Sequence, residues 1–247
     1  MKLVKKWLAV ACIICSCSSS ISAQKQFKAV LVTATRGWQH ASGHYGVEAL
    51  KQLADRNNFD LIIQEDPGLI NDKFLASVHV VIFLNTTGNI FDSAQQKAFE
   101  RFIQSGKGYV GIHAAADTEY DWAWYTQLVG RMFVSHPMIQ TTRLQVIDDN
   151  FPGMKTFKTG QLWTDEWYEY GPEKVTGLKY LMSIDEKSYN PKKPGSMGDT
   201  HGISWYHQFD GGRAFYTGLG HLPAIYSDQQ FLDHIYGGIY WAALGKL

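Results

Sequence analysis

Apolar strands that alternate with amphipathic helical segments constrain the fold of this chain more than any other feature. The apolar runs lie at 27–33, 61–63, 78–84 and 109–112. Strands that are apolar on both faces are typical of parallel sheets, because helices cover both sides. Apolar residues at helical spacing occur between these runs, at 47–54 and 94–103. The alternation predicts an α/β fold with a mostly parallel central sheet between two helical layers.

The second half of the chain has a different pattern. Shorter runs, several with alternating apolar residues, lie at 143–147, 162–170, 180–184, 203–209 and 213–219. Alternation favours strands of an antiparallel sheet. Asp210 and Gly211 supply a hairpin turn between the last two runs. We expect extra antiparallel strands in a single domain over residues 24–247.

Two helix starts can be predicted from their first turns. Asp92 and Gln95 have the spacing of a capping box, and Ser227 with Gln230 has the same spacing before the last helix. Gly106 is expected to end the first of these helices.

Residues 1–23 have the composition of a secretory signal. Three lysines precede a short apolar run, and a serine-rich stretch ends at Ala23. The run is too short to span a membrane comfortably. A lipoprotein leader is the alternative, with Cys12 or Cys17 as the lipidated residue. Both interpretations predict an exported protein, periplasmic or extracellular, and the second adds a lipid anchor.

Several function classes are excluded by composition. All three cysteines lie in the predicted leader, so the exported chain has no disulfide, cysteine nucleophile or thiolate metal site. Loss of three leader lysines leaves 20 Lys and Arg against 23 Asp and Glu, and no basic tract predicts nucleic-acid binding. No later segment is long and apolar enough for a membrane helix. Neither G-x-G-x-x-G after the first strand nor a P-loop is present, so no nucleotide cofactor is expected.

Polar side chains follow the predicted parallel strands. His113 comes directly after the fourth apolar run, where packing gives little reason for an imidazole. Arg36, Trp38 and His40 follow the first strand, and His221 follows the last. Because the carboxyl ends of parallel strands lie at one edge of a sheet, we expect His40, His113 and His221 to converge.

A carboxylate and a further histidine complete the candidate set. Asp165 and Glu166 are adjacent in a predicted strand and point to opposite faces, so one of them faces a pocket. We favour Glu166, because Thr164 and Tyr168 continue a polar, aromatic surface on its face. His136 precedes Pro137, and a functional role and a turn role stay equally open.

Imidazoles with a carboxylate suit two kinds of chemistry. They are ordinary ligands of zinc or a similar divalent ion, and the metal ligands would be His40, His113, His136 and His221. Without a metal, the same groups carry out acid–base catalysis near neutral pH. The sequence leaves both open.

Acidic and aromatic residues surround the predicted site. Rings of this kind line carbohydrate sites, but they also fill aromatic cores. The candidates for substrate contact are Arg36, Trp38, Asp117, Glu119, Tyr120, Trp124 and Tyr168. Asp117 and Glu119 could instead cap the next helix.

Motifs along the chain carry a resemblance to a known family. In order they are GYVGIH at 108–113, DTEYD at 117–121 with Trp124 and Tyr125, LVG at 128–130, SHP at 135–137, DEWY at 165–168, GRAFYTGLGH at 212–221 and GIYWAALG at 238–245. They cover nearly all of the chain after the leader. With them the chain resembles the trehalose-utilization, ThuA-like family.

The resemblance implies a class I glutamine amidotransferase-like fold, which is a flavodoxin-like three-layer sandwich. It also implies a role in sugar catabolism, on 3-keto sugars or trehalose-like disaccharides. Amidotransferases carry a nucleophilic cysteine at the sharp turn where this chain has His113, and His221 stands where their histidine is expected. We therefore expect an enzyme acting on a (3-keto-)disaccharide, with His113, His221 and Glu166 as catalytic residues.

Two other functions remain compatible with the sequence. A carbohydrate-binding or accessory module without catalysis would use the tryptophans, including Trp38 and Trp124, to bind a small-molecule sugar. An inactive amidotransferase-like scaffold for partners would bind neither metal nor sugar.

Overall fold

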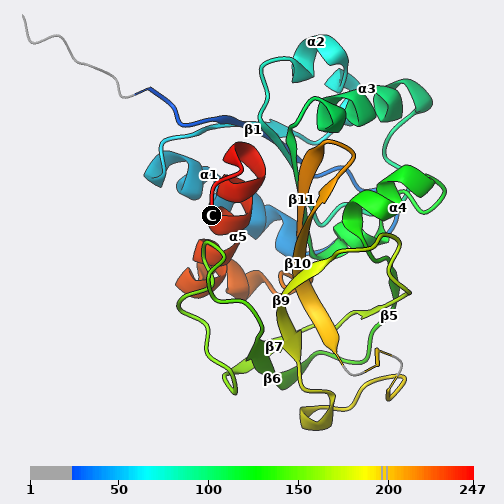
Figure 1. The fold of residues 1–247 in the computed structure, drawn as a ribbon, viewed down its shortest axis with the longest axis vertical. Coiled ribbons are helices and arrows are strands. Elements are labelled where there is room, and N and C mark those ends of the chain that lie inside the picture. The colour runs from blue at the N-terminus through cyan, green and yellow to red at the C-terminus, as the bar shows by residue number, and fades with distance from the viewer. Residues whose placement is uncertain (1–23, 196, 199) are drawn as a thin grey trace, which may run out of the picture.

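The large sheet predicted from the sequence forms the centre of the molecule (Figure 1). The structure, a computed structural model, describes residues 24–195, 197–198 and 200–247, and the predicted leader lies outside these residues. Within them the sheet has nine strands, in the order β2-β1-β3-β4-β11-β10-β9-β6-β7. Their bounds are β1 Lys28–Val32, β2 Asp60–Gln64, β3 Val80–Leu84, β4 Gly108–Ile112, β6 Gln140–Val146, β7 Leu162–Asp165, β9 Lys179–Ile184, β10 His201–Phe209 and β11 Gly212–Thr217.

The two halves of the sheet differ in strand direction, as predicted. Neighbouring strands from β2 to β11 pair in parallel. From β11 through β10, β9 and β6 to β7 every pairing is antiparallel. A separate pair, β5 (Phe133–Ser135) with β8 (Glu169–Tyr170), lies outside the large sheet. The parallel half therefore has one carboxyl edge, and β7 belongs to the antiparallel half.

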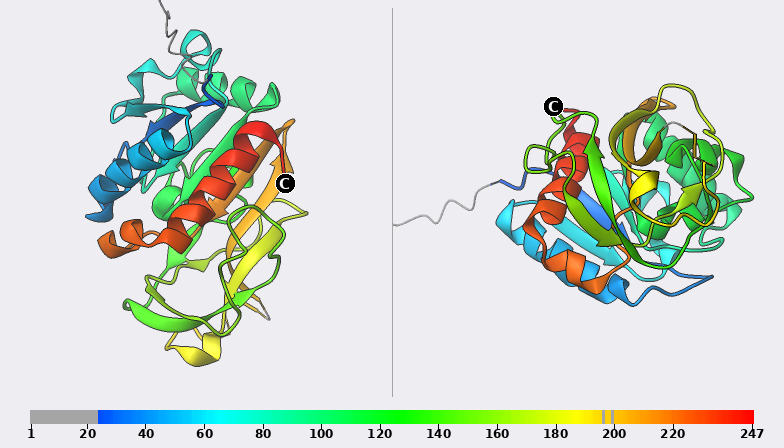
Figure 2. Two further views of the ribbon diagram at one scale, coloured as in Figure 1. Left: turned by 90° about the vertical axis from the view of Figure 1, so that its left-hand side faces the viewer. Right: turned by 90° about the horizontal axis from the view of Figure 1, so that it is seen from below.

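Helices cover both faces of the parallel half. One face carries α1 (Ser42–Arg56) and α5 (Gln229–Leu244), which lie side by side in front of the sheet in the left view of Figure 2. The other face carries α2 (Asp72–Leu75), α3 (Ser93–Gln104) and α4 (Ala123–Val129). Short 3₁₀ turns complete the chain: η1 Pro67–Leu69, η2 His113–Asp117, η3 Glu186–Ser188 and η4 Pro223–Ser227.

Alternate residues of each parallel strand supply the two cores. In β1, Ala29 and Leu31 pack in the core under α1 and α5, whereas Val30 and Val32 pack in the core under α3 and α4. This burial on both faces explains the continuous apolar runs of the sequence. No helix among the described residues is long and apolar enough to cross a membrane.

The predicted caps and turns are partly confirmed. Asp92 and Gln95 form a reciprocal capping box at the start of α3. Asp210 and Gly211 both have positive φ, at 48° and 88°, in the hairpin turn between β10 and β11. The predicted start of α5 was wrong by one residue, because Asp228 caps the helix by accepting the amide hydrogens of Gln230 and Phe231. Ser227 instead ends the preceding turn η4.

Candidate functional site

Four segments that are distant in the sequence meet at the carboxyl edge of the parallel strands. His40 comes from the β1–α1 loop, His113 directly follows β4, and His221 follows β11. Glu166 enters from the antiparallel half, directly after β7. One donor atom from each of the four residues lies within 4.8 Å of the others. The expected convergence of His40, His113 and His221 therefore occurs.

Three of these donor atoms form a tight triangle. His113 Nε2 lies 3.2 Å from His221 Nδ1 and 3.4 Å from Glu166 Oε2, and His221 Nδ1 lies 3.1 Å from that same oxygen. Zinc bonds of about 2.0–2.1 Å in a tetrahedron require neighbouring ligands about 3.3 Å apart. The spacing of the triangle therefore fits three ligands of one small divalent ion.

His113 is held in one orientation by its surroundings. Its side chain is fully buried, and its Nδ1–H donates to the carbonyl of Gly218 at 2.9 Å. The Tyr168 ring lies against the imidazole, with ring centroids 4.3 Å apart. Because Nδ1 carries the hydrogen, the lone pair of Nε2 faces the other donors, which is the tautomer that a metal ligand needs.

The backbone of His113 is in an uncommon conformation. Its φ is +49°, in the left-handed region, at the point where β4 turns into η2. A residue with a Cβ in this region is strained by about 1–2 kcal/mol. Sharp strand-to-helix turns of this kind present a catalytic side chain at the edge of an α/β sheet, and here they present an imidazole.

The residues of the cluster shift one another's pKa values. Burial, together with the neighbouring His113 and His221, lowers the pKa of His40 to about 3. Burial alone would raise the pKa of Glu166, but the close approach of His113 and His221 lowers it well below its usual range. Burial opposes protonation of His221, and its hydrogen bond with Glu166 nevertheless raises the pKa of His221. The cluster is therefore an anion surrounded by imidazoles.

Two residues support the cluster from outside. His136 lies on the far side of Glu166, with Nδ1 3.1 Å from Oε1 and 2.8 Å from the Pro137 carbonyl. The Pro137 carbonyl is an acceptor, so Nδ1–H donates to it, and the His136 ring lies against the Glu166 carboxylate. Asp165 is fully buried and accepts the amide hydrogens of Gly220 and His221 at 2.8 and 3.2 Å.

The family assignment follows from the whole chain. Residues 28–242 match the family model of ThuA, described as trehalose utilisation. This chain belongs to the ThuA family. A glutamine amidotransferase-like, flavodoxin-like sandwich is consistent with that membership.

Solved structures of ThuA-like proteins have the same fold. One from Bacteroides uniformis is 22% identical, with a TM-score of 0.74 over 91% of this chain and 94% of that chain. Another, from Parabacteroides merdae, is 19% identical, with a TM-score of 0.70 over 90% of this chain and 92% of that chain.

A match to a curated protein covers less of the chain. The methylenetetrahydrofolate–tRNA-(uracil-5-)-methyltransferase TrmFO of Gloeobacter violaceus is 33% identical over 105 residues, which is 42% of this chain and 23% of that protein. The ThuA chain thus spans about a quarter of the length of that relative.

Several predicted substrate residues of this ThuA chain lie near the cluster. Tyr168 contacts His113, as described above. Asp117, at the end of η2, accepts a hydrogen bond from the Tyr120 hydroxyl at 2.8 Å, and burial raises the pKa of Asp117. Arg36 is exposed, and Trp38 is exposed to 72% on the loop that leads to His40. Arg36 and Trp38 are therefore available to a ligand, whereas Tyr168 is buried.

Two predicted substrate residues serve the fold instead. The Glu119 carboxylate is 1% exposed and accepts the amide hydrogens of Ile90 and Phe91, each at 2.7 Å. Trp124 Nε1 donates to Asp210, in the hairpin that precedes β11. Because β11 begins beside the start of β4, that hairpin lies at the amino edge of the parallel strands, opposite the cluster. The prediction of substrate contact for these two was wrong because aromatic and acidic residues also build cores and caps.

Two residues beside the cluster were not predicted. Asp165 was passed over for Glu166, although both carboxylates belong to the site. Asn85 follows β3 with φ +51° and is 3% exposed. Its position at a strand end was the available signal, since an asparagine there tolerates the left-handed region.

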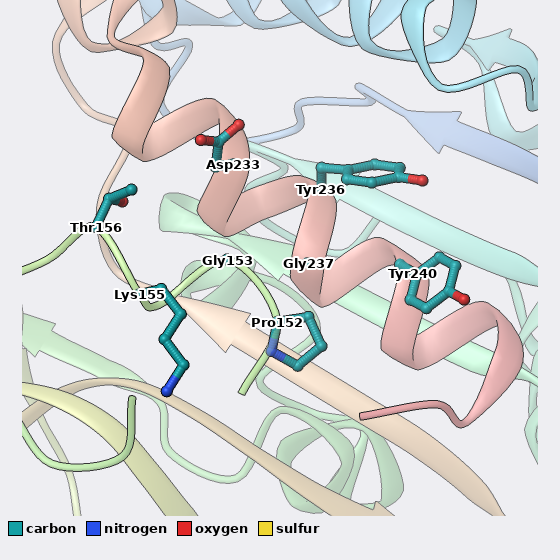
Figure 3. Close-up of a pocket in the computed structure, with 8 residues that line it drawn as sticks. All are labelled: Pro152, Gly153, Lys155, Thr156, Asp233, Tyr236, Gly237 and Tyr240. Atoms are coloured by element: carbon teal, nitrogen blue, oxygen red, sulfur yellow. The ribbon is translucent and has the colours of Figure 1, made fainter. Parts of the chain in front are cut away.

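A cavity of about 490 Å³ lies elsewhere on the molecule (Figure 3). It separates α5 from the segment 152–156, and Tyr236 and Tyr240 line it. The two walls approach closely at Gly153 and Gly237, where a Cβ atom would clash with backbone oxygens. None of the site residues predicted from the sequence lines this cavity.

Proposed function

We propose that this ThuA chain is an exported enzyme that acts on a disaccharide, or its 3-keto form, with a divalent ion such as zinc. His113, His221 and Glu166 would hold the ion, and His40 would offer a fourth nitrogen. The observation that carries the proposal is the triangle of donor atoms with edges of 3.1–3.4 Å.

The donor set fits such an ion in its chemistry as well as its spacing. Imidazole nitrogen and carboxylate oxygen are the ligands that zinc takes in catalytic sites. The buried Nδ1 of His40 has no hydrogen-bond partner among the described residues, which is costly unless something fills its place. The Gly218 carbonyl holds His113 from behind, as outer-shell groups of metal sites do, and His136 lies against Glu166.

The arrangement favours chemistry beside a sugar carbonyl. A bound divalent ion polarises a carbonyl oxygen and so makes the neighbouring C–H bond more acidic. Asp117 would accept that proton, because burial raises its pKa and the Tyr120 hydroxyl donates to its Oδ1 and so orients the carboxylate. Removal of this proton permits isomerisation, or loss of a glycosidic oxygen by elimination.

The test is a comparison of metal content and activity in matched histidine variants. Purified protein should contain about one divalent ion per chain, and a chelator should abolish turnover of 3-keto-trehalose. His113→Ala should lose both ion and activity. His79→Gln, at the amino edge of the sheet, should keep both, since Gln can still accept the Lys28 amide hydrogen. Full activity of His113→Ala without bound metal would exclude the proposal.

A binding module without catalysis is the second candidate, and the exposed Trp38 favours it. A tryptophan ring that is 72% exposed can stack on a sugar without any metal. This function predicts trehalose binding that is insensitive to chelator and lost in Trp38→Ala but kept in His113→Ala.

Export rests on the leader alone and has its own test. We expect the protein recovered from the periplasm or medium to begin near Gln24, as N-terminal sequencing would show. Recovery of the chain with lipid on Cys12 or Cys17 would favour the lipoprotein leader instead.

A further inference from the structure

We propose that His136 binds the substrate directly, by accepting a hydrogen bond from a hydroxyl group on the carbon beside the sugar carbonyl. The inference rests on the proposed function, because it assigns a contact to that same substrate. It replaces the role of metal ligand expected from the sequence, since His136 lies outside the group of four donor residues that converge.

The hydrogen bond of His136 determines which of its two nitrogens is free. Nδ1 lies 2.8 Å from the carbonyl oxygen of Pro137, which can only accept, so Nδ1 carries the hydrogen. A neutral imidazole has one such hydrogen, and Nε2 therefore presents a lone pair. Among the residues that the structure describes, none donates to this nitrogen. Nε2 is thus an acceptor that a ligand can use.

The free nitrogen of His136 can be reached from outside the protein. The side chain of His136 is 41% exposed, whereas that of Glu166 beside it is 8% exposed. His40, His207 and His234 each bury a nitrogen without a partner, but the unpartnered nitrogen of His136 is accessible. A hydroxyl group can therefore approach Nε2 without any movement of the chain.

Glu166 connects His136 to the donor cluster. Its Oε2 lies within 3.4 Å of His113 Nε2 and His221 Nδ1, and its Oε1 lies 3.1 Å from His136 Nδ1. The imidazole of His136 is thus separated by one carboxylate group from the proposed position of the ion. A sugar whose carbonyl oxygen binds that ion would have a carbon next to the carbonyl beside this ring. In a 3-keto sugar both of these carbons carry hydroxyl groups, which are the donors that Nε2 requires.

The segment that carries His136 is held by its neighbours. Ser135, the last residue of β5, donates its hydroxyl hydrogen to the buried carboxylate of Glu169. The Phe133 ring lies near the imidazole, with ring centroids 5.8 Å apart. A side chain that is already positioned loses little rotamer entropy when it binds a ligand. The hydrogen bond to the substrate should therefore contribute its full strength.

Two substitutions separate the roles of the two nitrogens. In His136→Asn the amide nitrogen takes the place of Nδ1 and can still donate to Pro137, but nothing replaces Nε2. In His136→Gln the amide reaches the place of Nε2 and offers an acceptor oxygen, but the donor to Pro137 is lost. His79→Asn is the matched control, because His79 is also half-buried and bonds a backbone group through Nδ1, at the amino edge of the sheet.

The measurement is KM and kcat of the zinc-loaded proteins for 3-keto-trehalose, with zinc content determined on each sample. We expect His136→Asn to raise KM about tenfold, the effect of one lost hydrogen bond. His136→Gln should restore most of the wild-type KM. Zinc content should equal that of the wild type in both variants, and His79→Asn should match the wild type in every measurement.

The other outcomes would overturn the contact in distinguishable ways. A wild-type KM in His136→Asn would exclude the contact and leave the proposed function intact. A higher KM in His136→Gln than in His136→Asn would also exclude it, because the hydrogen bond to Pro137 would then be the one that matters. Loss of zinc from both variants would make His136 a metal ligand instead. A zinc-loaded wild type that does not turn over 3-keto-trehalose would overturn the proposed function and the contact together.

Discussion

At the scale of single residues, the site depends on side chains whose partners leave them one orientation. His113 has one nitrogen committed to the Gly218 carbonyl, so the other must face the cluster. Glu166 has one oxygen 3.1 Å from His136 Nδ1 and the other within 3.4 Å of both His113 and His221. A preorganised ligand set loses little entropy when it binds a metal. Substitutions of the residues that support the ligands should therefore lower the metal affinity.

Asp165 should act as a positioning residue for this set. Its oxygens accept the amide hydrogens of Gly220, His221 and Glu166, and Asp165→Asn would turn an amide NH₂ toward one of them. We expect zinc affinity to fall about 10–100-fold and the free energy of unfolding to fall by about 1–3 kcal/mol. Competition titration and urea denaturation would measure these changes. Asp185→Asn, at a half-buried aspartate directly after β9 whose carboxylate accepts the Lys187 amide hydrogen, is the control, and equal zinc affinity in both variants would remove the positioning role.

His234 should make the fold sensitive to acid. It is fully buried in α5, and burial lowers its pKa to about 3. Because this value lies below that of the unfolded chain, His234 destabilises the fold as pH falls below about 6.5, by up to about 1.4 kcal/mol per pH unit, down to pH 3. His234→Gln should flatten that part of the pH profile in chemical denaturation at constant salt. An unchanged slope would show that His234 is not the titrating group.

At the scale of elements, close backbone approach fixes how α5 lies on the sheet. A Cβ atom on Gly108 of β4 would stand 2.2 Å from the carbonyl oxygen of Ala242. Within α5, Gly238 likewise leaves no room for a side chain, because a Cβ atom there would lie 2.4 Å from the Phe215 ring of β11. The helix therefore packs on β4 and β11 at a distance that only glycine permits, and this packing supports the strand ends that carry His113 and His221.

Gly108→Ala should consequently push α5 away from β4. We expect a loss of about 1–3 kcal/mol in the free energy of unfolding, the usual effect of overpacking. Gly171→Ala should be nearly neutral, because its Cβ would lie 3.6 Å from Val134. Thermal and urea denaturation of both variants would decide the point, and equal stability would show that α5 can shift without cost.

At the scale of the whole molecule, the cluster joins segments that are far apart in sequence. His40, His113, Glu166 and His221 come from both halves of the sheet. An ion held by these residues would bind the folded chain and not the unfolded one. Its binding would therefore stabilise the entire fold by mass action.

A chelator should accordingly lower the melting temperature of the wild type. Removal of an ion present at 100 times its dissociation constant costs about 2.7 kcal/mol, and a chain of this size loses about 2–4 °C per kcal/mol. His113→Ala should melt at the same temperature with and without chelator. Scanning fluorimetry with EDTA followed by zinc add-back would check this, and a chelator-insensitive wild type would contradict metal binding.

Local patterns in the sequence determined the elements of this protein. Continuous apolar runs specified strands buried on both faces, because each parallel strand must contact two helical layers. The capping box at Asp92 and the hairpin turn at Asp210 could also be predicted, because each depends only on neighbours a few residues away. Strand ends at one edge were enough to predict that His40, His113 and His221 converge.

Only the tertiary structure decided which polar residues belong to the site. Glu119 and Trp124 are chemically suited to a sugar, but folding places one under the α3 cap and the other at the opposite edge. Asn85 and Asp165 lie beside the site because they bond Ser42 and Gly220, which come from other segments of the chain. Local patterns set each strand and helix, whereas the hydrogen-bond partner that a buried amide or carboxylate finds comes from a segment 43 or 55 residues away, for Asn85 and Asp165 respectively.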